Sequence, residues 1–360
     1  MTSTPDPAAA TPEAPLPASS QGAEPHIVGP YLAEHLGDAA WKDCSVGLIS
    51  GGKSNLTYVV SSAAGEVVLR RPPLSTVLAT AHDMGREYTV MTALRDTAVP
   101  VPVTRLLCTD EEVLGAPFYV MDRVAGHVIR TDLPPGYADS PADRERMSRA
   151  LVEVLAAIHD VEIAGRLDGF GRPEGYLERQ LRRWVRQWEA SKAEELPALD
   201  ELAAELGASR PEQSASTLVH GDYRLDNTIM HPTDPSTVAA VLDWELSTLG
   251  DPLADVGLLY VYWGDPDNDI TQGVIRRVTS EPGFPSQADV MQMYAEASGR
   301  DLSALPWYIA FATYKLAVIS AGIAARARAG AMIGEGFDTA GAAVLPLVDA
   351  GLETLRRGSL

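Results

Sequence analysis

The chain has 360 residues, 46% of them hydrophobic, and a formal net charge of −20 at pH 7. This length allows one large two-lobed domain or two ordinary domains with a substantial buried core. The negative charge repels phosphate backbones and anionic lipid surfaces, and no apolar run is expected to cross a bilayer, so nucleic acid and membrane are excluded as expected partners.

Residues 1–25 are predicted to form a disordered tail. They are mostly Ala, Pro, Ser and Thr with almost no large apolar side chain, so they cannot offset the entropy of ordering. They also lack the basic start and hydrophobic stretch of a secretory signal, which predicts a cytoplasmic location. In that reducing compartment, Cys44 and Cys108 are expected to be free thiols.

Residues 26–122 are predicted to form a small lobe built on an antiparallel sheet. Apolar residues recur at helical spacing from Met84 to Leu94, which predicts one helix that crosses the sheet and carries Glu87. Four short apolar runs have the length and composition of strands: residues 44–48, 56–61, 66–69 and 118–121.

Residues 123–360 are predicted to form a larger, mostly helical lobe, which makes the whole chain an α+β protein. Ser140 and Pro141 supply an N-cap and a first-turn proline for a helix that ends at His159. Apolar spacing predicts three further helices, at residues 175–192, 303–329 and 338–356. The arginines of the first of these are interpreted as a solvated basic face.

A turn between the first two strands is rich in small residues: Gly51, Gly52, Ser54 and Asn55. Backbone amides in such a turn can approach phosphate groups closely. Glycine-rich turns join strands in many proteins, so the turn by itself is weak evidence. Its position before the strand that carries Arg70 favours a nucleotide site.

The strongest chemical signal is the segment His220–Asn227, which reads HGDYRLDN, followed by Asp243. Phosphoryl transfer needs a carboxylate that accepts the proton of the attacking hydroxyl and oxygen ligands that hold Mg²⁺. Asp222 fits the first role, and Asn227 and Asp243 fit the second. Taken singly, His220 could be a core histidine and Asp243 a turn residue, but their joint occurrence disfavours that alternative.

This segment resembles the signature of the aminoglycoside phosphotransferase family, H-G-D-x-x-x-x-N followed by an aspartate after a short strand. The resemblance covers the chain beyond the tail. It implies a two-lobed protein-kinase-like fold, ATP as phosphoryl donor with GTP not excluded, and Mg²⁺ as cofactor. It further implies that Asp222 is the catalytic base and that Asn227 and Asp243 ligate the metal.

A second stretch, Gly250–Asp255, also resembles the family pattern, and we interpret it as structural. Asp251 precedes a proline and is expected to cap a helix. Asp255 is expected to accept hydrogen bonds from backbone amides of the segment His220–Asn227, which we call the catalytic loop. His159 resembles a core histidine of the family rather than a catalyst.

Kinases hold the nucleotide phosphates with a strand lysine that pairs with a helix glutamate. This chain has Arg70 at the lysine position, and arginine keeps the cation but is bulkier. We interpret Arg70 and Glu87 as the phosphate-holding pair, with a surface ion pair as the alternative. Asp122 and Val124 lie where the family has its hinge, so their backbone groups are expected to pair with adenine.

The predicted function is transfer of the γ-phosphoryl group of ATP to a hydroxyl group of a small-molecule acceptor. One alternative is a pseudokinase-like binding module, which only the arginine at position 70 favours, because the other expected polar groups are present. A Mg²⁺-dependent hydrolase is a weaker alternative, since it would leave the glycine-rich turn and the hinge without a purpose.

The acceptor is predicted from a narrower resemblance. Cations that suit a carboxylate or acyl-CoA are Arg224, beside the base, and Lys315 and Arg326 on a late helix, although a water-facing helix explains the last two equally well. Four runs look most like the kinase-like domains associated with acyl-CoA dehydrogenases, which implies a hydroxyacyl acceptor: Leu69–Pro73, Gly169–Pro173, Tyr176–Gln180 and His220–Asn227. A true aminoglycoside kinase is the alternative, with candidate acidic groups at Asp265, Asp267 and Asp269.

Overall fold

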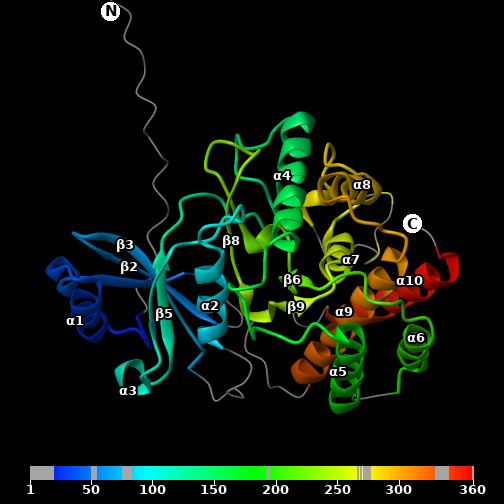
Figure 1. Ribbon diagram of the computed structural model, residues 1–360, viewed down its shortest axis with the longest axis horizontal. Coiled ribbons are helices and arrows are strands. Elements are labelled where there is room, and N and C mark those ends of the chain that lie inside the picture. The colour runs from blue at the N-terminus through cyan, green and yellow to red at the C-terminus, as the bar shows by residue number, and fades with distance from the viewer. Residues whose placement is uncertain are drawn as a thin grey trace, which may run out of the picture. The chain divides into compact units, whose positions relative to one another are not determined.

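The computed structural model describes residues 20–49, 55–74, 83–192, 195–265, 267, 270, 277–328 and 340–358 (Figure 1). The chain divides into two compact units. Unit 1 consists of Met1–Tyr88 and Val103–Arg123, and unit 2 of Thr89–Pro102 and Val124–Leu360. The helix α2 (Met84–Leu94) begins in unit 1 and ends in unit 2.

Unit 1 contains a five-stranded antiparallel sheet with the order β1-β2-β3-β5-β4. The four predicted strands are confirmed within two residues at each end. The edge strand β4 was missed because the charged Arg105 interrupts its short apolar run. The strands are β1 (Ser45–Leu48), β2 (Leu56–Ser62), β3 (Gly65–Arg71), β4 (Thr104–Cys108) and β5 (Phe118–Asp122).

The core of unit 1 lies where the buried centres of the middle strands meet. Leu69 of β3 pairs with Tyr58 of β2 and with Val120 of β5, and all three side chains are almost fully buried. Helix α1 (Pro25–Leu36) adds Leu32 to the same cluster. A short helix, α3 (Glu111–Leu114), joins β4 to β5.

The predicted tail is too long at its C-terminal end. The Tyr58 hydroxyl donates to the carbonyl of Gln21 at 2.5 Å, and the Arg71 guanidinium donates to the carbonyl of Gly22 at 2.6 Å. Ala23 is completely buried. Residues 20–25 therefore belong to unit 1, because sheet side chains far along the sequence bind their backbone, and composition cannot reveal such contacts.

Unit 2 is mostly helical and contains two small antiparallel sheets. Ser140 caps α4 reciprocally with Asp143, which confirms the predicted helix start. The helices are α4 (Pro141–His159), α5 (Tyr176–Ser191), α6 (Pro197–Ala208), α7 (Leu253–Tyr262), α8 (Gln287–Ser298), α9 (Leu305–Arg328) and α10 (Val344–Arg357). The sheets pair β6 (Thr217–Val219) with β9 (Thr248–Gly250) and β7 (Thr228–Met230) with β8 (Val238–Val241).

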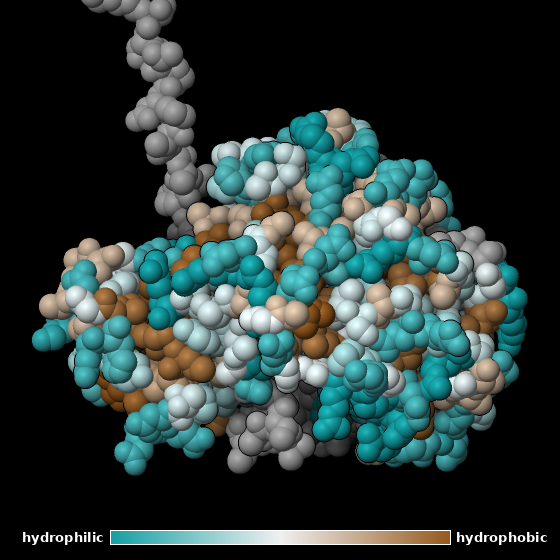
Figure 2. All heavy atoms as spheres, viewed as in Figure 1, coloured by the Kyte–Doolittle hydropathy of each residue, from teal (hydrophilic) through white to brown (hydrophobic). Residues whose placement is uncertain are grey.

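Helix α5 has the two-sided character that its sequence predicts. Trp184 and Trp188 are buried, while Arg182, Arg183 and Arg186 are exposed. The visible surface over this helix is hydrophilic (Figure 2). The interpretation as a solvated basic face therefore agrees with the structure for these three arginines, whereas Arg179 is only partly exposed and donates to the backbone carbonyls of Glu174 and Arg172.

Helix α9 corrects the expectation about apolar runs. By length and composition it could cross a membrane, with a mean hydropathy of 1.5 over its most apolar window. However, 67% of that window is buried inside the protein, where α9 packs against α7 and α10. A core helix passes the same test as a membrane span, and burial identifies α9 as the central helix of unit 2.

Candidate active site

The β7–β8 hairpin brings the predicted metal ligands to one end of a small sheet. Thr228 pairs with Val241, and the N–H of Leu242 donates to the carbonyl of Asn227 at 2.8 Å. In an antiparallel pair, the residue before one strand faces the residue after the other. Asn227 therefore faces Leu242, the residue before Asp243, so both predicted ligands leave the hairpin at the same end, although the sequence separates them by a strand, a turn and a second strand.

The carboxylate of Asp222 is held through both of its oxygen atoms. The Tyr262 hydroxyl donates to Oδ1 at 2.8 Å, and Asn227 Nδ2 donates to Oδ2 at 2.9 Å. Asn227 Nδ2 also donates to the backbone carbonyl of Asp222 at 2.8 Å. The side chain of Asp222 remains 20% exposed, so a small molecule can reach it.

A buried aspartate and a partly buried lysine hold the backbone of the catalytic loop. Asp255 accepts the N–H groups of His220 and Gly221 at 2.6 and 2.8 Å, as the sequence predicted. Lys315 donates from Nζ to the carbonyl of Gly221 at 2.8 Å. Burial alone would raise the pKa of Asp255, but hydrogen bonds from His159 and from the His220 amide leave it below its ordinary value.

The other two residues interpreted as structural take that role. Asp251 accepts the N–H of Leu253, the first residue of α7, at 3.0 Å, although the N-cap position itself is occupied by Pro252 rather than by Asp251. His159 is buried, with Nδ1 2.7 Å from the Tyr294 hydroxyl and Nε2 3.3 Å from Asp255. Its position in the core, bonded to the residue that holds the catalytic loop, agrees with the prediction of a core histidine.

Arg224 lies beside the base in an internal ion-pair network. Its Nε is 3.0 Å from Asp226 Oδ1 and 3.6 Å from Asp222 Oδ2. Its guanidinium carbon lies 4.6 Å from the centroid of the Tyr262 ring, within cation–π range. Arg224 thus pairs with two carboxylates of its own loop. From the sequence, it was expected to bind an anionic acceptor.

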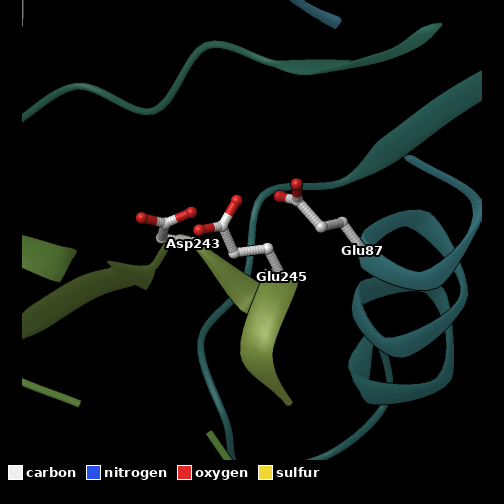
Figure 3. Close-up of side chains that lie close together, drawn as sticks. All are labelled: Glu87, Asp243 and Glu245. Atoms are coloured by element: carbon white, nitrogen blue, oxygen red, sulfur yellow. The ribbon is translucent and has the colours of Figure 1, made fainter. Parts of the chain in front are cut away.

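The oxygen donors near Asp222 suit a hard divalent cation. Because Asn227 turns its Nδ2 toward Asp222, its Oδ1 is the amide atom left for a metal. Glu245, on the short 3₁₀ turn after β8, places a carboxylate oxygen within 4.8 Å of one of Asp243 (Figure 3). Carboxylate and amide oxygens are the ligands that Mg²⁺ prefers, so this set fits the predicted cofactor. Glu245 was not predicted as a metal ligand. Its position two residues after Asp243 was the sequence feature that could have indicated this role.

The predicted phosphate-holding pair is formed within unit 1. Arg70 Nε lies 3.2 Å from Glu87 Oε2, and these side chains are 13% and 0% exposed, which rules out the surface ion pair. Tyr119, missed in the sequence, donates to Glu87 Oε2 at 3.0 Å, and Asn55 donates to Oε1 at 3.2 Å. The other residues of the predicted phosphate turn, Gly51, Gly52 and Ser54, lie outside the described residues.

At the predicted hinge, one backbone group is already occupied. The N–H of Asp122 donates to the carbonyl of Val103 at 2.8 Å, and its carboxylate binds Arg105 in a bidentate ion pair. Any pairing of Asp122 with adenine would therefore use its carbonyl. Val124 is the first residue of the main segment of unit 2.

The residues predicted for the acceptor separate into two groups. Lys315 is bound to the catalytic loop and lies 5.6 Å from the ring centroid of Trp184, and burial lowers its pKa. Arg326 is exposed, in agreement with the water-facing alternative. Asp265 accepts the N–H groups of Asp267 and Gln287 and so has a structural role, while Asp269 lies outside the described residues.

Comparisons with known proteins agree with this geometry. The profile of the phosphotransferase enzyme family matches residues 45–288. Acyl-CoA dehydrogenase family member 10 of Mus musculus is 38% identical over 303 residues, which are 83% of this chain and 28% of that protein. This chain spans less than half the length of the curated relatives that it matches.

Solved structures show the same fold. A Ralstonia eutropha JMP134 protein, provisionally assigned as an aminoglycoside phosphotransferase, is 34% identical with a TM-score of 0.79, over 93% of this chain and 98% of that one. A thermostable mutant aminoglycoside phosphotransferase, solved with AMP-PNP and hygromycin B, is 16% identical with a TM-score of 0.59, over 91% and 97% of the two chains. The predicted α+β, kinase-like fold is thereby confirmed.

Proposed function

The chain belongs to the phosphotransferase enzyme family, and from this premise we propose that it transfers the γ-phosphoryl group of ATP to a hydroxyl group of a small molecule. The observation that carries this function is the Asp222 carboxylate, oriented by two donors and one-fifth exposed, on the loop that also supplies Asn227. Phosphoryl transfer is catalysed mainly by positioning and electrostatics, and this loop supplies both.

In the proposed reaction, Asp222 accepts the proton of the acceptor hydroxyl. The acceptor oxygen forms a bond to the γ-phosphorus, and the bond from that phosphorus to the β,γ-bridging oxygen breaks, which releases ADP. Asn227, Asp243 and Glu245 would hold Mg²⁺, and the bound ion would neutralise charge on the phosphates. The chain itself keeps the base in place through the contacts of its loop.

In unit 1, Arg70 is the proposed ligand of the nucleotide phosphates. Its ion pair with the buried Glu87 fixes the guanidinium, whose planar fork suits phosphate oxygens. The AMP-PNP bound to the distant aminoglycoside phosphotransferase supports an adenine nucleotide as donor. A pseudokinase-like role was favoured only by this arginine, and the ordered Arg70–Glu87 pair weakens that alternative.

We propose a hydroxyacyl compound as acceptor. The curated relatives are named as acyl-CoA dehydrogenase family members, and this chain matches only part of each, which supports a role beside acyl-group chemistry. An aminoglycoside would need free carboxylates near the base, whereas Asp265 already receives two backbone N–H groups.

The test is a transfer assay with Mg-ATP. Acceptors would be hydroxybutyryl-CoA with the hydroxyl on carbon 2, 3 or 4, the corresponding free acids, ethanolamine and kanamycin, with ADP release and phosphorylated product measured by mass spectrometry. We expect a hydroxyacyl compound to be the best acceptor, and the Asp222→Asn variant to lose about a hundredfold or more in turnover while binding Mg-ATP normally. Binding of Mg-ATP without transfer to any acceptor would support the pseudokinase alternative instead.

A further inference from the structure

We propose that Tyr262 is a positioning residue that holds the carboxylate of Asp222 in the orientation that accepts the proton of the acceptor hydroxyl. This role rests on the phosphotransferase activity proposed above. It adds to the site a residue at the end of α7 that lies 40 residues after Asp222 in the sequence.

The first step is the pair of donors on the base. The Tyr262 hydroxyl binds Oδ1 and the Asn227 amide binds Oδ2. The terminal torsion of an aspartate side chain has broad minima, so a single donor leaves the plane of the carboxylate soft. A second donor on the opposite oxygen removes that freedom. Tyr262 thus selects one plane of the Asp222 carboxylate.

The second step is the helix that carries the tyrosine. Asp255, in the first turn of α7, binds the backbone of His220 and Gly221, and Tyr262 is the last residue of the same helix. Residues seven apart lie on one face of a helix, about two turns or roughly 10 Å from each other. Helix α7 therefore positions both the backbone of the catalytic loop and the side chain of its base.

The third step is that Tyr262 is kept as a donor. Its burial, followed by the charge of Asp222, raises the pKa of Tyr262 well above its ordinary value, so the phenol keeps its proton. Its ring lies against the guanidinium of Arg224, which is itself paired with Asp226. A phenylalanine at this position would keep the ring and lose only the donor.

The variant Tyr262→Phe tests this role in the full-length chain, with Mg-ATP hydrolysis and transfer to hydroxybutyryl-CoA as readouts. We expect kcat to fall about tenfold, as for loss of one hydrogen bond to a charged group, while the KM for ATP stays within about twofold of wild type. Tyr314→Phe is the matched control, because Tyr314 is buried and its hydroxyl lacks a hydrogen-bond partner among the described residues. Its kcat should equal that of wild type.

A double-mutant cycle separates positioning from general stability. In the Asp222→Asn background, Tyr262→Phe should change kcat by less than about twofold, because the carboxylate that it orients is gone. Equal losses in both backgrounds, or a wild-type kcat in Tyr262→Phe, would overturn the role of Tyr262. A wild-type enzyme that turns over no ATP would instead refute the phosphotransferase function itself.

Discussion

Asp243 has a left-handed backbone, with φ of 66° and ψ of 55°. Residues other than glycine adopt this conformation rarely, and it costs on the order of 1 kcal/mol. The conformation turns the chain sharply after β8 and starts the 3₁₀ turn that carries Glu245. At the scale of single residues, a small backbone strain thus accompanies the placement of two carboxylates.

Two substitutions at Asp243 separate this strain from the proposed metal binding. Asp243→Gly removes the carboxylate and relieves the backbone, so it should keep or raise the melting temperature while weakening Mg²⁺-dependent ATP binding about tenfold or more. Asp243→Ala should weaken binding equally and lower stability. Calorimetric titration of ATP with and without Mg²⁺ measures the effect, with the exposed Asp301→Ala as control. Unchanged binding in Asp243→Gly would remove this residue from the metal site.

At the scale of elements, α7 is attached to the catalytic loop through a buried carboxylate. Asp255→Asn keeps the shape of the side chain but turns one acceptor into a donor facing a backbone N–H. We expect a loss of about 3 kcal/mol in the free energy of unfolding, typical of a broken buried charged contact. Chemical denaturation at pH 7 measures this loss.

The same substitution predicts a pH dependence. Since the pKa of Asp255 is lower in the folded protein than its ordinary value, its stabilisation is present above that ordinary value and is lost as the pH falls through the folded value. The difference in unfolding free energy between wild type and Asp255→Asn should be constant from pH 7 to about 5 and shrink below about pH 4. A difference that grows on acidification would contradict this assignment.

Residues 20–24, which precede α1, are expected to contribute to the stability of unit 1. Deleting residues 1–24 should lower the melting temperature by several degrees relative to deleting residues 1–19, because the longer deletion leaves the buried Arg71 guanidinium without the Gly22 carbonyl. Differential scanning calorimetry of the two truncated chains measures this directly. Equal melting temperatures would show that residues 20–24 contribute nothing to unit 1.

At the scale of the whole molecule, the net charge of −20 would attract a cationic aminoglycoside, but charge over the whole surface says little about one pocket. We expect that expressing the protein in a kanamycin-sensitive host confers no resistance, and that kcat/KM is higher for a hydroxyacyl compound than for kanamycin. Minimum inhibitory concentrations and steady-state kinetics test this. Kanamycin phosphorylation with a micromolar KM would contradict it.

Local sequence was sufficient for the parts of the site that lie close together along the chain. Asp222 and Asn227 share one loop, and the short segment HGDYRLDN that contains them is a pattern that can be read from consecutive residues. The capped start of α4 was also predictable, because helix caps have short, specific patterns. The role of Asp255, which reaches His220 across 35 residues of sequence, was expected only from the resemblance of its stretch to the family pattern.

Only the tertiary structure decided which distant side chains complete the site. Tyr262 reaches Asp222 across 40 residues of sequence and Lys315 reaches Gly221 across 94, and neither has a spacing that a local pattern could reveal. The sequence by itself determined the reactive groups, since carboxylate and amide chemistry belongs to residue type. Their orientation depended on packing, because a hydrogen bond requires its donor within about 3 Å and helix packing alone sets that distance.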